Sequence, residues 1–189
     1  MAAEIISTDI KHCGWTTFLV ATIRLPDGST LDRVIEDHGN AVCVLPYDPA
    51  RRTAILVQQL RAPALYAAQR PHFLEAVAGR IDEGENAENS ARREAVEEAG
   101  LRLRALDRVA TAWAMPGVST EQMDLFLGEY SAADRVSAGG GIEGENIEVL
   151  EIPLAKLAAM ADSGDLHDMK TLVLLQTLRL RRPELFTPA

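Results

Sequence analysis

The sequence predicts a mixed α/β or α+β fold, and the order of its expected elements carries this prediction. Apolar and β-branched runs of strand length fill the first part of the chain. One helix with a regular alanine stripe follows, and then come further strand-like runs and two closing helices. The expected strands cover residues 16–25, 29–37, 40–48, 53–61, 73–79, 103–113, 123–130 and 146–153, and the expected helices cover residues 87–99, 153–164 and 168–182.

Turn and capping residues mark the ends of these elements. Asp27-Gly28 separates the first two strands, since glycine tolerates the positive φ of a tight turn, and Asp48-Pro49 separates the next two. Asn86 is suited to cap the first helix, and Gly100 lies where a left-handed C-cap would fall. Alanines at every fourth position give this helix a smooth stripe that can lie close on a sheet: Ala87, Ala91, Ala95 and Ala99.

Composition limits the classes of function. The 189 residues are 47% apolar and 25% charged, which is typical of a soluble globular protein with one good core. The formal net charge of -9 argues against a nucleic-acid backbone as partner, although cations could still bridge a small anionic substrate to the protein. No signal pattern or membrane-spanning segment stands out, so we expect a cytoplasmic location. Cys13 and Cys43 lack metal-ligand spacing, and we expect two reduced, buried thiols.

The last turns of the first helix concentrate negative charge. At about 100° per residue, Glu94 and Glu98 lie about 40° apart around the helix axis, and Glu97 lies about 60° from Glu94. Three carboxylates at the rim of the buried face repel unless a cation joins them, and Mg²⁺ prefers oxygen ligands together with waters and substrate phosphates. Several carboxylates could hold more than one ion. The structural alternative is a solvated acidic helix that ends at a glycine.

The segment around this helix resembles the sequence box of Nudix hydrolases. The matching residues are Gly79, Glu85, Arg93, Glu94, Ala95, Glu97, Glu98, Gly100 and Leu101. The resemblance implies an α/β/α sandwich and Mg²⁺-dependent hydrolysis of a diphosphate linked to a nucleoside, with Mn²⁺ as a possible substitute. It implies metal binding by the Ala78 carbonyl and by Glu94 and Glu98, with Glu97 as a further catalytic carboxylate. It also implies that Gly79 lies against the substrate and that Arg93 pairs with Glu85.

Signals outside the box resemble the branch of this family that hydrolyses ADP-ribose and nucleotide sugars. Pro116, fifteen residues after Leu101, is similar to the proline of that branch. Arg61, in "QQLRAPA", matches an arginine that meets a substrate phosphate, and Arg33 occupies a position that can reach the site of a second subunit.

The final third resembles the bacterial GDP-mannose hydrolases of that branch. The similar stretches are "AGGGIEGENIEVLEIPL" and "SGDLHDMKTLVLL". This likeness implies a metal-binding and catalytic role for Glu145, makes Glu143 a candidate general base, and implies substrate or metal contacts for Glu121 and Lys170. Val77, where ADP-ribose enzymes usually carry proline, favours the same type.

Three of these features could instead have a purely structural role. Arg61 could be a solvated charge at a strand end, and Lys170 a surface lysine on a helix. Gly139, Gly140 and Gly141 could form a flexible connector rather than a mobile acidic lid.

We therefore expect hydrolysis of a GDP-mannose-type nucleotide sugar to a nucleoside monophosphate and a sugar phosphate. ADP-ribose, giving AMP and ribose 5-phosphate, is the alternative substrate. A non-catalytic sensor of nucleotide sugars is the alternative class, and the complete set of box glutamates argues against it.

The resemblance also implies an assembly. Residues 1–38 would form a small N-terminal β unit that makes a domain-swapped homodimer, and residues 39–189 would form the hydrolase domain. The sequence supports this indirectly, because an isolated two-stranded hairpin is only marginally stable in water.

Overall fold

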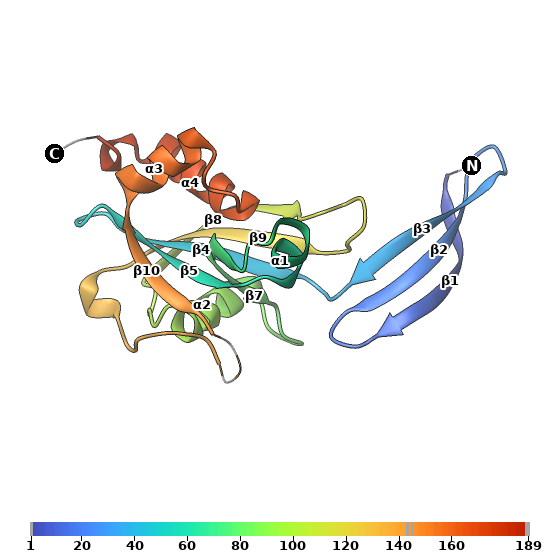
Figure 1. The fold of residues 1–189 in the computed structure, drawn as a ribbon, viewed down its shortest axis with the longest axis horizontal. Coiled ribbons are helices and arrows are strands. Elements are labelled where there is room, and N and C mark those ends of the chain that lie inside the picture. The colour runs from blue at the N-terminus through green and yellow to red at the C-terminus, as the bar shows by residue number, and fades with distance from the viewer. Residues whose placement is uncertain (1, 143, 145, 188–189) are drawn as a thin grey trace. The chain divides into compact units, whose positions relative to one another are not determined.

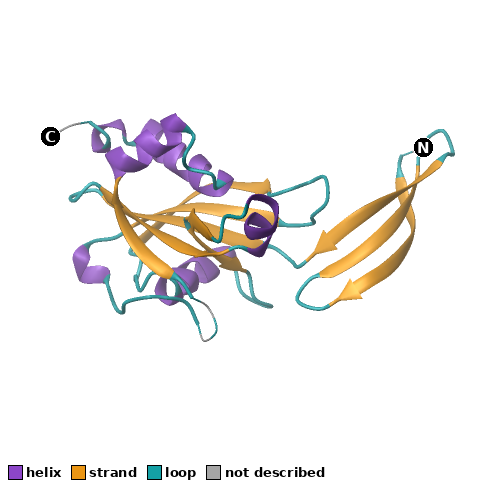
Figure 2. Ribbon diagram, viewed as in Figure 1, coloured by secondary structure: helices purple, strands orange, loops and turns teal. Residues whose placement is uncertain are grey.

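The computed structural model describes residues 2–142, 144 and 146–187, and it confirms the mixed α/β fold. The chain divides into two compact units (Figures 1 and 2). The N-terminal unit contains the residues up to Ala41 together with Thr111–Met123, and the large unit contains Val42–Ala110 and Asp124–Ala189. The predicted boundary after residue 38, and the dimerisation role of the segment before it, stay predictions.

A seven-stranded sheet organises the large unit. Its strands run in the order β10-β5-β4-β9-β8, while β6 pairs with β5 and β7 pairs with β4. All eight residues of β4 are buried, as expected for a central strand. The strands are β4 (Ala41–Asp48), β5 (Thr53–Leu60), β6 (His72–Glu75), β7 (Val77–Arg80), β8 (Ala105–Trp113), β9 (Gln122–Glu129) and β10 (Glu148–Pro153).

Helices cover both faces of this sheet. Figure 1 shows α3 and α4 on one side of it and α2 on the other, which is an α/β/α arrangement. None of the helices in the described residues is long and apolar enough to cross a membrane. The helices are α1 (Ala62–Ala68), α2 (Ala87–Glu97), α3 (Leu154–Ser163) and α4 (Met169–Arg181), with short 3-10 turns at Ala132–Asp134 and Pro183–Leu185.

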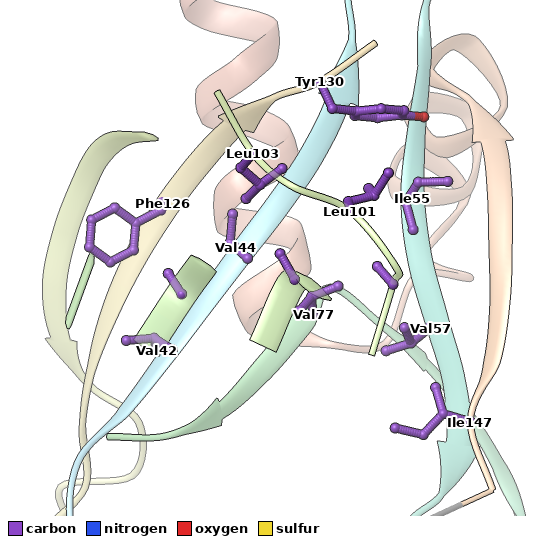
Figure 3. Close-up of a cluster of buried hydrophobic side chains, with 13 residues drawn as sticks. Val42, Val44, Ile55, Val57, Val77, Leu101, Leu103, Phe126, Tyr130 and Ile147 are labelled. Carbon is purple, nitrogen blue, oxygen red and sulfur yellow. The ribbon is translucent and has the colours of Figure 1, made fainter. Parts of the chain in front are cut away.

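The core between α2 and the sheet depends on the alanine stripe. Ala91, Ala95 and Ala99 are fully buried, and Ala87 packs at the edge of the same cluster. Small side chains let the helix axis approach the strands closely. Figure 3 shows the larger side chains that fill the space opposite them: Val42, Val44, Ile55, Val57, Val77, Leu101, Leu103, Phe126, Tyr130 and Ile147.

Two elements of the large unit differ from the prediction. The expected strand at 73–79 is divided at Ala76, because the Ala76 amide donates to the hydroxyl of Thr171, at 2.7 Å, and not to a strand. The halves then pair with different strands, β6 with β5 and β7 with β4. Helix α1 was not predicted, since its seven residues are apolar at every position and show no alternation of apolar and polar faces, and none of them is buried.

The N-terminal unit contains a three-stranded antiparallel sheet in the order β1-β2-β3. The predicted β2–β3 hairpin is confirmed, and Gly28 adopts φ +88° in its turn. Strand β1 was not predicted. Its ten residues are all exposed and its register with β2 shifts twice, so the alternation that marks a half-buried strand is absent. The strands are β1 (Glu4–Cys13), β2 (Thr17–Arg24) and β3 (Thr30–Asp37).

The cysteine prediction was half wrong. Cys43 is buried in the central strand β4, and burial raises the pKa of its thiol. Cys13 is exposed, because it lies at the end of the edge strand β1.

The segment 111–123 belongs to the N-terminal unit through hydrogen bonds to the end of β3. The Glu36 amide donates to the carbonyl of Val118 at 2.7 Å, and the Thr120 amide donates to the carbonyl of Glu36 at 3.0 Å. The Glu36 carboxylate also accepts the hydroxyls of Ser119 and Thr16. Glu36 therefore fastens this segment to the sheet.

His38 lies between two carboxylates in the same unit. Its Nδ1 is 2.6 Å from Glu36 Oε1, its Nε2 is 3.1 Å from Glu121 Oε1, and the ring of Trp15 stacks on it. Both ring nitrogens can donate only when the imidazole is protonated. Partial burial acts to lower the pKa of His38, but the hydrogen bonds to Glu36 and Glu121 outweigh it and raise the pKa above the ordinary value of 6.5.

The raised pKa of His38 predicts a pH-dependent stability. The folded state binds the proton more tightly than the unfolded state, so this contribution is fully present below about pH 6.5 and is lost as the pH rises through the folded-state pKa. Thermal unfolding followed from pH 5.5 to 9 should show the loss in the wild type, and His38→Gln should lack that component. A wild-type pH profile identical to that of the variant would contradict the ion-pair assignment.

Candidate active site

Helix α2 begins and ends where its capping residues require. The side chain of Asn86 accepts the amide of Asn89 at 2.9 Å, and Gly100 adopts φ +67° just beyond the last turn, which confirms both predicted caps. This register turns Glu94 and Glu98 towards the sheet, where they are only 9% and 5% exposed. Glu97 is half-buried. The box carboxylates therefore lie at the edge of the buried face of α2, as the helix geometry predicts.

Strand β7 brings its backbone against these carboxylates. The amide of Ala78 donates to Glu98 Oε2 at 3.1 Å. A Cβ atom on Gly79 would lie 2.0 Å from Glu94 Oε1, so any side chain at this position would displace the carboxylate. Gly79 therefore provides the space that Glu94 occupies, and Ala78 and Gly79 lie within the predicted constellation.

Arg93 ties the acidic groups together and confirms the predicted pairing with Glu85. Its Nε and Nη2 donate to Glu85 Oε2 at 3.2 and 3.1 Å, and Nη2 also donates to the carbonyl of Arg80 at 2.9 Å. Its Nη1 donates to Glu94 at 2.6 Å and to Glu97 at 3.2 Å. A guanidinium shared in this way fixes the loop before α2 and orients the carboxylates.

Glu98 is a buried carboxyl with other carboxyls nearby. Burial, with added repulsion from Glu94 and Glu75, raises its pKa to about 8. The hydrogen bond from the Ala78 amide and the charge of Arg61 act in the opposite direction and are outweighed. An incoming cation would stabilise the ionised form of Glu98 at this end of the acidic edge.

The donor set fits a hard divalent cation. Carboxylate and carbonyl oxygens are the ligands that Mg²⁺ prefers, and it commonly takes one or two protein carboxylates and completes its shell with waters and substrate phosphates. Within the described residues, no three His, Cys, Asp or Glu side chains converge on a point that could hold an ion unaided. Two further predicted acids of the site, Glu143 and Glu145, lie outside the described residues.

The glycine-rich loop is anchored on the end of α2. The amide of Gly140 donates to the carbonyl of Glu98 at 2.8 Å, and that of Gly141 to the carbonyl of Glu97 at 3.0 Å. These bonds satisfy carbonyls that the end of a helix leaves unpaired. A Cβ atom on Gly139, which has φ +72°, would lie 2.4 Å from the carbonyl oxygen of Glu98. At this end the loop is a close-packed cap on the glutamates.

Arg61 and Lys170 meet on one buried carboxylate. Arg61 Nε donates to Glu75 Oε1 at 2.7 Å, and Lys170 Nζ donates to Glu75 Oε2 at 2.5 Å and to Asp168 Oδ1 at 2.9 Å. Sequence reasoning named Arg61 and Lys170 but missed Glu75 and Asp168. A glutamate inside the apolar run "FLEAVAG" was the available signal, because a charge in a buried strand needs a partner.

The remaining predicted site residues lie in the N-terminal unit. Arg33 and the segment from Pro116 to Thr120 line one groove with a volume of about 450 Å³, together with Ile23, Val34 and Ile35. Arg33 Nη1 donates to the carbonyl of Asp32 at 2.9 Å. Glu121 contacts His38, as described above. The structure thus brings Arg33 and Pro116 into one groove.

Comparisons with known proteins agree on one family. The NUDIX domain family matches residues 37–166 of the chain. A GDP-mannose pyrophosphatase from Cronobacter sakazakii is 39% identical over 151 residues, which cover 79% of this chain and 78% of the relative. One from Citrobacter koseri is 37% identical over 147 residues, with 77% and 76% covered. A crystal structure of an ADP compounds hydrolase superposes with a TM-score of 0.78 over 97% of this chain and 96% of that one, at 18% identity, and shares the fold.

Removal of the charge of Glu98 should separate ion binding from folding. Glu98→Gln keeps the shape and can still accept the Ala78 amide, so without metal its melting temperature should equal or exceed that of the wild type. Addition of Mg²⁺ should raise the melting temperature of the wild type only. The kcat of the variant should fall by at least about 10²-fold, the scale for loss of one charge-stabilising group.

Glu88→Gln is the matched control for this experiment, because Glu88 is an exposed glutamate in the first turn of the same helix. Its kinetics and its response to Mg²⁺ should match the wild type. If Glu98→Gln had the kinetics of the wild type, Glu98 would not be a ligand of the proposed ion.

The anchoring of the glycine-rich loop predicts a second effect. Gly139→Ala adds a clash with the Glu98 carbonyl to the strain of a positive φ, whereas Gly164→Ala adds only the strain, because Gly164 (φ +83°) has open space around it. Gly164→Ala should lower the free energy of unfolding by about 1 kcal/mol and leave kcat unchanged. Gly139→Ala should lower the free energy of unfolding by more than Gly164→Ala does, and it should also lower kcat. Urea unfolding and steady-state kinetics measure these two quantities. Equal effects of the two substitutions would show that the loop does not depend on this contact.

Proposed function

The chain belongs to the Nudix family, and on this premise we propose that it hydrolyses the diphosphate of a nucleoside diphosphate sugar of the GDP-mannose type. The products would be a nucleoside monophosphate and a sugar phosphate. As a Nudix pyrophosphohydrolase, the chain is an enzyme of a family that typically uses a divalent metal. The observation that carries the proposal is the buried acidic edge of α2, where Glu94 and Glu98 lie against strand β7.

The residues that would hold Mg²⁺ are the Ala78 carbonyl, Glu94, Glu98 and Glu145, and Mn²⁺ could replace it. When bound, more than one such ion would neutralise the diphosphate and polarise the attacked phosphorus. The protein contributes the fixed geometry, because Arg93 holds Glu94 and the Ala78 amide holds Glu98. Carboxylates that are already oriented do not have to reorganise as charge develops in the transition state.

An acidic residue of the site would accept the proton of the attacking water. We assign the general-base role to Glu143 or Glu145, which follow the anchored glycines in the sequence. Glu97 would be a further catalytic carboxylate, and its hydrogen bond to Arg93 fixes its position relative to Glu94. The net charge of -9 supports a requirement for bridging cations, since the protein and an anionic substrate repel each other without them.

Arginines would bind the rest of the substrate. Arg61 is held through its Nε, and in the part of the chain that the structure describes no hydrogen bond occupies the two terminal nitrogens of its guanidinium, which could meet a phosphate in bidentate fashion. The backbone at Gly79 would lie against the diphosphate beside Glu94. Arg33 and Glu121, in the N-terminal unit, would contact other parts of the nucleotide sugar, and the groove at Arg33 supports this role. For Lys170, the predicted substrate contact is reconsidered below.

The choice of sugar nucleotide rests on two observations. The relatives described above are GDP-mannose pyrophosphatases at 37–39% identity, each aligned over most of both chains. Val77 also stands where ADP-ribose enzymes usually carry proline. The ADP compounds hydrolase shares 18% identity, which supports a common fold but no common substrate.

The working enzyme would be a domain-swapped homodimer. Apolar side chains are exposed on the sheet of the N-terminal unit, among them Ile5 (58%), Ile10 (62%) and Val34 (51%), and a second copy of the chain would cover them. Light scattering at assay concentration should give twice the mass of the chain, and Ile10→Glu should lower it to the monomer mass. A monomer mass for the wild type would contradict the proposed dimer. It would also contradict a role for Arg33 in the site of a second copy.

A panel of nucleotide sugars tests the activity itself. With Mg²⁺ present and an added phosphatase to release phosphate from the products, GDP-mannose should give a higher kcat/KM than ADP-ribose, UDP-glucose or ADP-glucose. A preference for ADP-ribose would replace the proposed substrate. Binding of nucleotide sugars without any hydrolysis would overturn the enzymatic proposal in favour of a sensor.

A further inference from the structure

We propose that Glu75 is a positioning residue of the active site, which orients Arg61 towards a substrate phosphate, and that Lys170 acts through Glu75 and not on the substrate. The inference deepens the proposed function and rests on it, since Arg61 is the residue expected to meet the phosphate. Neither Glu75 nor the ring of contacts behind it follows from the sequence motif.

Glu75 belongs to a closed ring of buried contacts. Its Oε2 accepts from Lys170, and Lys170 also donates to Asp168 Oδ1. The other oxygen of Asp168 accepts the amide and hydroxyl of Thr171 at the start of α4. The Thr171 hydroxyl in turn accepts the amide of Ala76, the neighbour of Glu75. The ring therefore joins the first turn of α4 to the junction of β6 and β7, three residues before Gly79.

This ring fixes the carboxylate of Glu75. Glu75 is 2% exposed and Thr171 is fully buried. Buried polar groups in a satisfied network are held in one arrangement, because any other arrangement would leave a donor or an acceptor without a partner. One oxygen of Glu75 is directed into the ring, and the other receives Arg61.

Arg61 sits at the outer edge of this arrangement. Its side chain is 43% exposed, whereas its partner carboxylate is buried. Within the described residues its guanidinium hydrogen-bonds to Glu75 through Nε alone, so the edge formed by Nη1 and Nη2 can receive another anion. A single buried contact thus sets the direction in which Arg61 presents its free edge.

Lys170 is arranged differently. Its ammonium is occupied by Glu75 and Asp168 at 2.5 and 2.9 Å, and its side chain is 16% exposed. Both carboxylates are themselves buried, so release of Lys170 towards a substrate would leave Glu75 with Arg61 and Asp168 with the amide and hydroxyl of Thr171 as their remaining partners among the described residues. The arrangement favours a lysine that offsets the cost of burying the charged Glu75 carboxylate, whose other oxygen accepts Arg61.

A double-mutant cycle tests whether Glu75 acts through Arg61. Arg61→Ala should lower kcat/KM for GDP-mannose by about 10²–10³-fold, the scale for loss of one charge-stabilising donor. Glu75→Gln should lower it by about 10²-fold, the scale for a misplaced binding group. The double variant should be no worse than Arg61→Ala, because the two substitutions remove one interaction. Losses that multiply would overturn the proposal.

A second pair of variants separates positioning from stability. Glu75→Gln leaves the buried Lys170 with Asp168 alone, so its melting temperature should fall, and the additional substitution Lys170→Met should restore part of it. The kcat/KM should stay at the level of Glu75→Gln, since Arg61 still lacks its anchor. Recovery of kcat/KM together with the melting temperature would show that Glu75 is merely structural.

Two controls complete the design. Asp48 is also a buried carboxylate, and it accepts the amides of Ala50 and Arg51 in the β4–β5 turn. Asp48→Asn should lower the melting temperature and leave kcat/KM unchanged. In nuclear magnetic resonance spectra, the Nε–H proton of Arg61 should be protected from solvent exchange in the wild type and not in Glu75→Gln.

This spectroscopic result is independent of turnover. If the wild type hydrolyses no nucleotide sugar, the proposed function fails, while a protected Arg61 proton would still support the anchoring. An unprotected Arg61 proton in an active wild type would overturn the anchoring alone.

Discussion

The structure depends on the desolvation of two carboxylates at the edge of α2. Glu94 and Glu98 are almost buried, and Arg93, which donates to Glu94, also holds Glu85 and Glu97. Burial, with added repulsion from Glu94 and Glu75, raises the pKa of Glu98. Burial of a carboxyl such as Glu98 beside other carboxyls costs free energy of folding. The arrangement makes sense when a divalent cation and an anionic substrate complete it.

The surrounding elements allow this arrangement to exist. The alanine stripe brings α2 close to the sheet, and Gly79 leaves room for the Glu94 carboxylate where any side chain would displace it. The amides of Gly140 and Gly141 close the end of the helix. By contrast, the cluster of Arg61, Glu75, Asp168 and Lys170 contains two positive and two negative side chains and is internally compensated. This cluster is balanced and holds Arg61 in place. At the acidic edge of α2, Arg93 is shared among three carboxylates beside the buried Glu98, which suits this edge to bind ions.

Local features of the sequence were sufficient to predict much of this site. Asn86 and Gly100 define α2, and the helical repeat then determines that Glu94 and Glu98 share one edge. Contacts between residues far apart in the sequence could not be predicted. The division of the strand at Ala76 depends on Thr171, which lies 95 residues further along the chain. The pairing of Arg61 with Glu75 and Lys170 likewise joins separate segments, so no spacing rule reveals it. Strand β1 escaped prediction because its exposed residues and irregular register erase the alternating pattern.

The location of a bound divalent ion tests the central claim most directly. Crystals of the protein grown with Mn²⁺ and a non-hydrolysable analogue of GDP-mannose would reveal the ion by its anomalous scattering. The account predicts an anomalous peak within coordination distance of the carboxylates of Glu94 and Glu98 and of the Ala78 carbonyl, with the diphosphate of the analogue in contact with it. Mn²⁺ and the diphosphate bound elsewhere, with the edge of α2 free of both, would contradict it.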